Sequence, residues 1–111
     1  MTPDAFREIA LEMQGAVEGA HMGHPDFRAN GRIFASLHAN DTTGMVKLTP
    51  EEQAEFIRLK PKMFTPSSGA WGRQGCTNVV LARADARTLR QAMTLAWEGA
   101  LARKPARRPR R

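Results

Sequence analysis

Apolar side chains recur at the spacing of an α-helix in the first part of the chain. Thr2 and Pro3 form a cap and first-turn pair ahead of this pattern, and Gly15 ends it. We therefore expect an amphipathic helix over about residues 3 to 15. Its apolar stripe consists of Phe6, Ile9, Ala10 and Met13.

Two further helices are predicted from their starting signals. Thr49 and Glu52 have the spacing of a capping box, and the helix that follows should end before Pro61. Its weak apolar face indicates that it lies across an edge of the core. Asp85 caps a long final helix. The apolar side chains of that helix are Leu89, Ala92, Met93, Ala96, Trp97, Ala100 and Leu101.

Between the first two helices the pattern changes to short runs separated by turn signals. These runs begin at Val17, before a Gly23-His24-Pro25 breaker. Asn30-Gly31 lies between residues 27–29 and 32–38 and predicts a tight hairpin, because both turn residues tolerate positive φ. A polar turn follows, and Met45-Val46-Lys47-Leu48 predicts the next strand. A last strand is expected from Thr77 to Ala82.

Residues 61 to 75 are rich in proline, serine and glycine, which predicts a packed, irregular loop. Met63, Phe64 and Trp71 are its aromatic and apolar members. Trp71 fits either a loop anchor or a platform for stacking, and the pattern favours the anchor. Trp97, on the stripe of the final helix, is predicted to lie in the core.

The order of elements is helix, about three strands, helix, loop, strand, helix. This order predicts an α+β fold in which an antiparallel meander is covered on one face by the N- and C-terminal helices. The other sheet face and the hairpins would then be free to meet a partner. We expect a single domain over residues 1–102.

Charge is concentrated at the C-terminal end of the chain. The 111 residues contain 17 Lys and Arg and 11 Asp and Glu, for a net charge of +6. Residues 1–102 contain 11 of each sign, so the body is neutral and a general argument from basicity to nucleic-acid binding fails. The excess of positive charge lies in residues 103–111, which are predicted to be disordered. This segment is expected either to bind any polyanion or to be a solubilising extension. Its cations are Arg103, Lys104, Arg107, Arg108, Arg110 and Arg111.

Several classes of protein are disfavoured. No run approaches the ~20 apolar residues of a membrane span, and the N-terminus lacks the features of a signal peptide, so we expect a cytoplasmic protein that binds no membrane. Cys76 has no partner for an internal disulfide. It could be a nucleophile, but its place at the start of an apolar strand favours a buried structural thiol. Without a phosphate loop, a serine elbow or paired carboxylates, no enzyme and no catalytic residue is predicted.

A metal site can be drawn from residues in and around the hairpin. Imidazole and carboxylate groups suit zinc or iron(II). However, no standard ligand spacing is completed, and His24 before Pro25 is more typical of a turn residue that satisfies a backbone group. We therefore expect no metal and no cofactor. The residues considered are His21, His24, Asp26 and His38.

Four cationic side chains of the body are candidates for contact with DNA. Arg28 and Arg32 flank the Asn30-Gly31 turn, Lys47 lies on the next strand, and Arg73 lies in the glycine-rich loop. On alternating strands Arg28, Arg32 and Lys47 should point away from the core, where they can donate to phosphate oxygens. The alternative is an ordinary solvated sheet face.

Four motifs, in order, carry a resemblance to a known family. They are Gly23-His24-Pro25-x-Phe27, Gly31-Arg32-Ile33-Phe34-Ala35, Val46-Lys47-Leu48-x-Pro50-Glu51-Glu52 and Trp71-Gly72-Arg73-x-Gly75. Together, over about residues 3 to 101, they resemble the MmcQ/YjbR-like family. The resemblance implies a frataxin-type (CyaY-like) fold and DNA binding through a double wing of β elements. One departure is Cys76, where family members often carry an aromatic residue.

These observations lead to two functional hypotheses. The first is a small, non-enzymatic DNA-binding protein that contacts the phosphate backbone through its hairpin wings and its basic C-terminal segment. The alternative is a protein-interaction or small-ligand-binding accessory domain that uses the exposed sheet face and the Trp71 loop. Its pocket would be lined by His24, Phe64 and Trp71.

Overall fold

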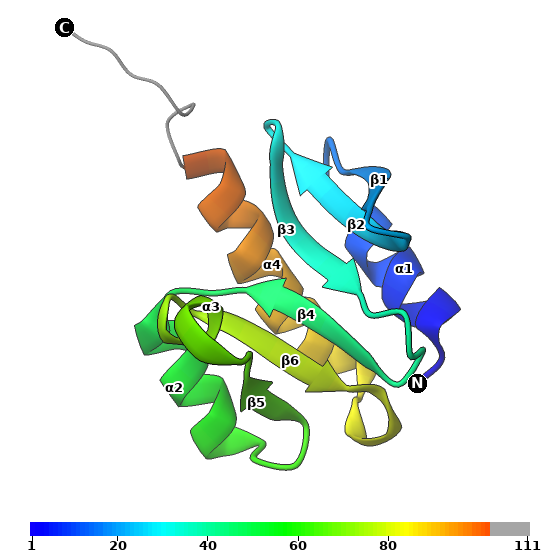
Figure 1. Ribbon diagram of the computed structural model, residues 1–111. Coiled ribbons are helices and arrows are strands. Elements are labelled where there is room, and N and C mark those ends of the chain that lie inside the picture. The colour runs from blue at the N-terminus through cyan, green and yellow to red at the C-terminus, as the bar shows by residue number, and fades with distance from the viewer. Residues whose placement is uncertain (103–111) are drawn as a thin grey trace, which may run out of the picture.

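The computed structural model describes residues 1–102, which form helices packed on an antiparallel sheet (Figure 1). The basic segment 103–111, and the prediction made for it, lie outside the described residues. The helices are α1 (Pro3–Leu11), α2 (Pro50–Leu59), α3 (Gly69–Arg73) and α4 (Ala86–Ala102), with a 3₁₀ turn over Leu81–Arg83. The strands are β1 (Val17–His21), β2 (His24–Ala29), β3 (Arg32–Leu37), β4 (Thr43–Lys47), β5 (Phe64–Pro66) and β6 (Cys76–Val80).

The six strands form one sheet in the order β1-β2-β3-β4-β6-β5, and every neighbouring pair is antiparallel. The β2–β3 hairpin turns at Asn30 and Gly31, whose φ angles are 56° and 72°. Positive φ at both positions is the geometry that this pair of residues favours. A bulge between Phe27 and Arg28 shifts the register of the hairpin. The predicted α+β fold is confirmed.

The two faces of the sheet have different environments. α1 and α4 cover one face (Figure 1), where Phe27, Ala35 and Val46 occupy paired positions and are fully buried. α4 continues the core with Leu89, Met93 and their neighbours, as its helical spacing predicts. Within residues 1–102, the opposite face has no helix packed along it apart from the short α3 at its edge (Figure 1). The terminal helices therefore lie on one face, as expected, and leave the other open.

The segment predicted as an irregular loop, residues 61–75, contains both β5 and α3, so that prediction is wrong. β5 forms because Phe64, Thr65 and Pro66 pair with β6, a contact that local sequence does not encode. β1 is likewise an additional strand, paired with β2 where the sequence showed only short runs. The first helix ends at Leu11 rather than near residue 15, and the last strand ends at Val80 rather than Ala82.

The two tryptophans differ from their predicted positions. Trp71 is 66% exposed, so it is not a buried loop anchor. Trp97 is only half-buried against the core, and its indole Nε1 donates a hydrogen bond of 2.8 Å to the carbonyl oxygen of Gln14. Cys76 is buried, as expected for a structural thiol. Among residues 1–102, no helix has the length and apolar character needed to span a membrane.

Candidate functional site

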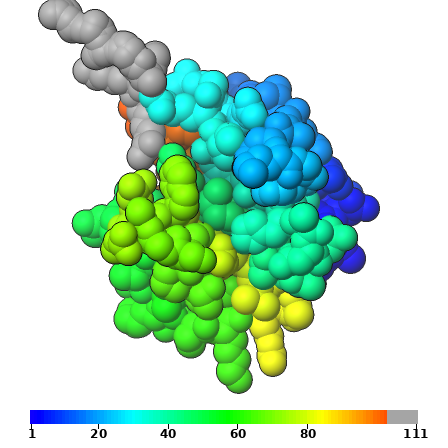
Figure 2. Space-filling model, viewed as in Figure 1, coloured from blue at the N-terminus to red at the C-terminus, as the bar shows by residue number. Residues whose placement is uncertain are grey.

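The open face of the sheet contains a pocket of about 690 Å³. Its walls come from the β1–β2 and β2–β3 hairpins on one side and from α3 with the preceding serines on the other. Figure 2 shows the hollow between the blue and cyan hairpin segments and the yellow-green segment around residue 70. The side chains of β3, β4 and β6 form its floor, because Ser36, Met45 and Asn78 occupy directly paired positions on this face.

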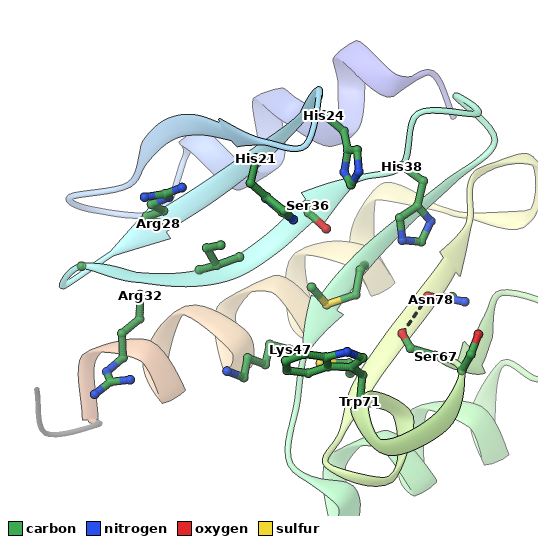
Figure 3. Close-up of a pocket in the computed structure, with 15 residues that line it drawn as sticks. His21, His24, Arg28, Arg32, Ser36, His38, Lys47, Ser67, Trp71 and Asn78 are labelled. Atoms are coloured by element: carbon green, nitrogen blue, oxygen red, sulfur yellow. Dashed lines mark hydrogen bonds between the residues drawn. The ribbon is translucent and has the colours of Figure 1, made fainter. Parts of the chain in front are cut away.

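Three of the four cations singled out in the sequence meet at this pocket. Arg28, Arg32 and Lys47 line it, and no aspartate or glutamate is among its described lining residues (Figure 3). Arg73, at the end of α3, is exposed but does not line it. Arg28 and Lys47 reach the pocket from β2 and β4, whereas Arg32 pairs with the buried Ala29 and its side chain extends toward the end of α4 at the edge of the lining (Figure 3). Arg73 stays apart.

Arg32 and Lys47 also border a smaller hollow of about 240 Å³ between the sheet and the last turns of α4. The lining of this second hollow includes Ala102, the last described residue. The described chain therefore ends next to two cations of the main pocket.

Arg28 is held by a buried carboxylate. Its Nε and Nη2 donate to the two oxygens of Asp26 at 2.7 and 3.0 Å, and Asp26 has no exposed surface. His21 Nδ1 lies 2.7 Å from the same carboxylate. The hydrogen bond from Arg28, together with that from His21, holds the pKa of Asp26 below its ordinary value despite its burial. Arg28 therefore faces the pocket with its charge partly compensated, which the strand pattern did not reveal.

Three histidines line the same pocket. The rings of His21 and His24 lie 5.0 Å apart, and His38 Nδ1 is hydrogen-bonded to the hydroxyl of Thr43. Burial, and then the nearby His24, lower the pKa of His38. Within residues 1–102, His24 Nδ1 is buried without a hydrogen-bond partner, so it is a polar atom that a ligand can satisfy.

The histidines and Asp26, considered above as metal ligands, do not form a metal centre in the structure. Asp26 is occupied by Arg28 and His21. Over the described part of the chain, no three His, Cys, Asp or Glu side chains gather closely enough to hold an ion.

Trp71 forms the wall of the pocket opposite the hairpins (Figure 3). α3 carries it, and Gln53 on α2 fastens this region: its Nε2 lies 3.0 Å from the Gly72 oxygen and 2.9 Å from the Cys76 oxygen. Gly72 is required by packing, because a Cβ there would lie 1.8 Å from the Ser67 oxygen. Trp71 is thus exposed to solvent on a segment that Gln53 and the contact of Gly72 with Ser67 hold in place.

The prediction of a small-ligand pocket lined by His24, Phe64 and Trp71 is wrong for one residue. His24 and Trp71 line the pocket, but Phe64 does not. Phe64 pairs with Val79 and points to the helical side, where its ring lies 5.3 Å from that of Phe56. Sequence spacing could not reveal this, since the direction of Phe64 depends on the unforeseen strand β5.

Sequence reasoning also missed pocket residues that are neither charged nor aromatic. Strand alternation was the signal that could have indicated them, but it shows which side chains share a face only when the register between strands is known. The residues are Ser36, Met45, Ser67 and Asn78, of which the Ser67 hydroxyl and the Asn78 side-chain oxygen are 2.8 Å apart. They supply hydrogen-bonding groups and an apolar surface beside the cations, an arrangement suited to an anionic ligand with a flat or apolar part.

Comparison with known proteins places these features in a family. The chain is similar in structure to the crystal structure of the Deinococcus radiodurans protein DR2400, a DUF419 domain, with a TM-score of 0.71 and 17% identity over 86% of this chain and 75% of that chain. This likeness shows a shared fold. No match is found among curated proteins. The model of the YjbR family matches residues 11–99. The chain therefore belongs to the YjbR family.

Proposed function

We propose that this protein binds DNA through the cationic pocket face of its sheet and catalyses no reaction. The observation that carries the proposal is the convergence of Arg28, Arg32 and Lys47 on one lining that contains no described acid. Guanidinium and ammonium groups donate to phosphate oxygens, which supply most of the affinity of non-specific nucleic-acid binding.

The distribution of the remaining charges supports this choice of face. Three arginines outside the pocket are paired with carboxylates: Arg7 with Asp4 and Glu18, Arg58 with Glu55, and Arg90 with Glu12. The body is neutral as a whole, and no acid belongs to the described pocket lining, although the buried Asp26 pairs with Ser36 and is bonded to Arg28 and His21 at its edge. A local positive field on a neutral body is enough to orient a polyanion.

The hairpins correspond to the wings of the proposed interface. β1–β2 and β2–β3 form one rim of the pocket and α3 the other, so a DNA strand lying along the sheet meets both (Figure 3). The described chain ends at Ala102, which borders the same hollow as Arg32 and Lys47, and we propose that the cations of residues 103–111 add non-specific contacts. We propose that residues 1–102 determine where the DNA lies on the protein, and that residues 103–111 contribute a large part of the affinity.

The test is a salt titration of DNA binding by fluorescence anisotropy on the full chain. Each phosphate contact contributes about 0.7 to 0.9 to the slope of log K against log salt. Arg32→Ala with Lys47→Ala should reduce the slope by about 1.5, and replacing the six cations of residues 103–111 by glutamine should reduce it by up to about 5.

The matched control is Lys62→Ala with Arg87→Ala, which removes the same charge from exposed positions outside the pocket. The proposal fails if both pairs of substitutions weaken DNA binding equally. It also fails if replacing the six cations of residues 103–111 by glutamine abolishes DNA binding, so that Arg32 and Lys47 have no remaining effect.

The pocket volume also favours a second candidate function, small-ligand binding. About 690 Å³ lies within the usual range of small-molecule sites, roughly 300–1,000 Å³. In that case a mononucleotide or another small organic phosphate would bind as tightly as an oligonucleotide. The variant with glutamine in place of the six cations of residues 103–111 would bind this small ligand with unchanged affinity. Isothermal titration of both ligands distinguishes the two functions.

A further inference from the structure

We propose that the pocket receives an unpaired base of single-stranded DNA, stacked on the indole of Trp71. The proposal rests on the DNA-binding function above and deepens it by naming the form of DNA. Three features carry it: the exposure of Trp71, the chemistry of the pocket floor, and the concave shape of the site.

Trp71 is an aromatic side chain with an unusual position. Trp71 is 66% exposed, yet it stands at the wall of a pocket that Lys47 also lines, rather than on a convex surface (Figure 3). Its segment is fixed by Gln53 and by the close approach of Gly72 to Ser67. An exposed aromatic face in a pocket lined by cations is a means by which proteins stack unpaired bases.

The floor of the pocket suits the edge and face of a base. Asn78 supplies an amide, Ser36 a hydroxyl, and Met45 an apolar surface, all from paired positions on adjacent strands. His24 adds a buried ring nitrogen that no described group satisfies. The cations at the rim can hold the phosphates that flank such a base. A simple anion would make no use of the indole or the apolar floor.

The concave shape selects against duplex DNA. In a duplex each base is stacked between its neighbours and paired, so the phosphates at the rim can be reached but the indole cannot. Bringing a base into the pocket would require extruding it, which costs unstacking and unpairing free energy. An unpaired strand does not carry this cost, and we therefore expect preference for single strands.

The experiment compares three DNA probes on the full chain. They are a short thymidine oligonucleotide, an abasic oligonucleotide of equal length, and a duplex of equal length. The thymidine strand should bind about ten-fold more tightly than the abasic strand, because both carry the same phosphates and only one can stack. Trp71→Ala should abolish this difference, and Trp71→Phe should restore part of it.

The control is Leu59→Ala, which removes another exposed apolar side chain, 55% exposed, from α2 outside the pocket. It should leave the ratio of thymidine to abasic binding unchanged. Tryptophan fluorescence provides a second readout, because stacking should quench Trp71 while Trp97, bonded to Gln14 and outside the pocket lining, gives a constant signal. Trp71→Phe should lose the quenching.

The outcomes separate this inference from the function on which it rests. Equal binding of thymidine and abasic strands, still weakened by Arg32→Ala with Lys47→Ala, overturns the base pocket and leaves DNA binding in place. Absence of binding to all three probes overturns both. A duplex that binds more tightly than the thymidine strand also overturns the base pocket.

Discussion

Position 75 requires glycine both for its backbone conformation and for the close approach of a neighbouring strand. Its φ is +114°, and a Cβ would lie 1.9 Å from the Leu48 oxygen. This glycine joins α3 to β6 and accepts a hydrogen bond from the Leu48 amide. The sequence signal was merely a glycine in a glycine-rich loop; the close approach to Leu48 exists only after β4 and β6 have paired.

Replacing Gly75 by Ala should therefore lower the free energy of unfolding by about 2–5 kcal/mol, from backbone strain and overpacking together. Urea denaturation measures it. Gly99→Ala is the matched control: a Cβ at this α4 position meets no atom within 4 Å, and helix propensity should raise stability by about 0.5–1 kcal/mol. Equal effects of the two substitutions would contradict the assigned role of Gly75.

Asp26 makes stability depend on pH in the acid range. Its pKa is lowered in the folded protein, chiefly by the Arg28 hydrogen bond, so the folded state favours the ionised form. The resulting stabilisation is fully present above the ordinary carboxyl pKa near 4 and is lost as pH falls through the lower folded pKa. Asp26→Asn should remove it, on the order of 1–3 kcal/mol at pH 7.

The measurement is urea unfolding of wild type and Asp26→Asn between about pH 7 and pH 3. The difference between their unfolding free energies should shrink as the pH falls. Asp41→Asn, in the exposed turn before β4, is the control and should leave wild-type behaviour unchanged. A difference that stays constant with pH would show that Asp26 acts through shape rather than charge.

At the level of elements, α3 depends on its neighbours. It has five residues, and its N-cap Ser68 makes no side-chain capping bond. An isolated helix of this length is unstable in water, because nucleation is costly. Gln53, from α2, bonds the Gly72 and Cys76 oxygens and thus joins α2 to both α3 and β6. The position of Trp71 follows from this link.

Gln53→Ala should therefore lower the free energy of unfolding by about 1–3 kcal/mol, because buried acceptors lose their donor. Hydrogen exchange should accelerate at the α3 amides more than in α4, and binding to the thymidine oligonucleotide should weaken. Gln91→Ala, at an exposed position of α4, is the control and should change none of these. Unchanged α3 exchange would show that the helix is held by other contacts.

Predictability from sequence also differed between elements. The capping box of Thr49 and Glu52, the N-cap at Thr2 and the Asn30-Gly31 hairpin all formed as predicted, since each depends on residues a few positions apart. β5 and α3 could not be predicted in this way. β5 exists through pairing with β6, and α3 through contacts with α2 and the Ser67 backbone.

For the whole molecule, the neutral balance of residues 1–102 conceals an uneven distribution of charge. The helices and their loops carry ion pairs such as Arg90 with Glu12 and Arg58 with Glu55, and the pocket lining combines Arg28, which is paired with the buried Asp26, with Arg32 and Lys47. Counting charges along the chain could assign the net +6 to residues 103–111 but could not reveal a cationic face. That face arises from the pairing of β2, β3 and β4, whose register brings these three side chains to one pocket.

The sequence by itself determined the helices with strong caps, the central hairpin, the α+β class and the covering of one sheet face by the terminal helices. Helical spacing, capping and turn chemistry act over a few residues, so they can be read directly from the chain. Only the tertiary structure decided that Phe64 turns into the core, that Trp71 turns outward, and that Asp26 compensates Arg28. These outcomes depend on strand register and on contacts between distant segments, because the direction of a side chain is fixed only when its strand or helix has a partner.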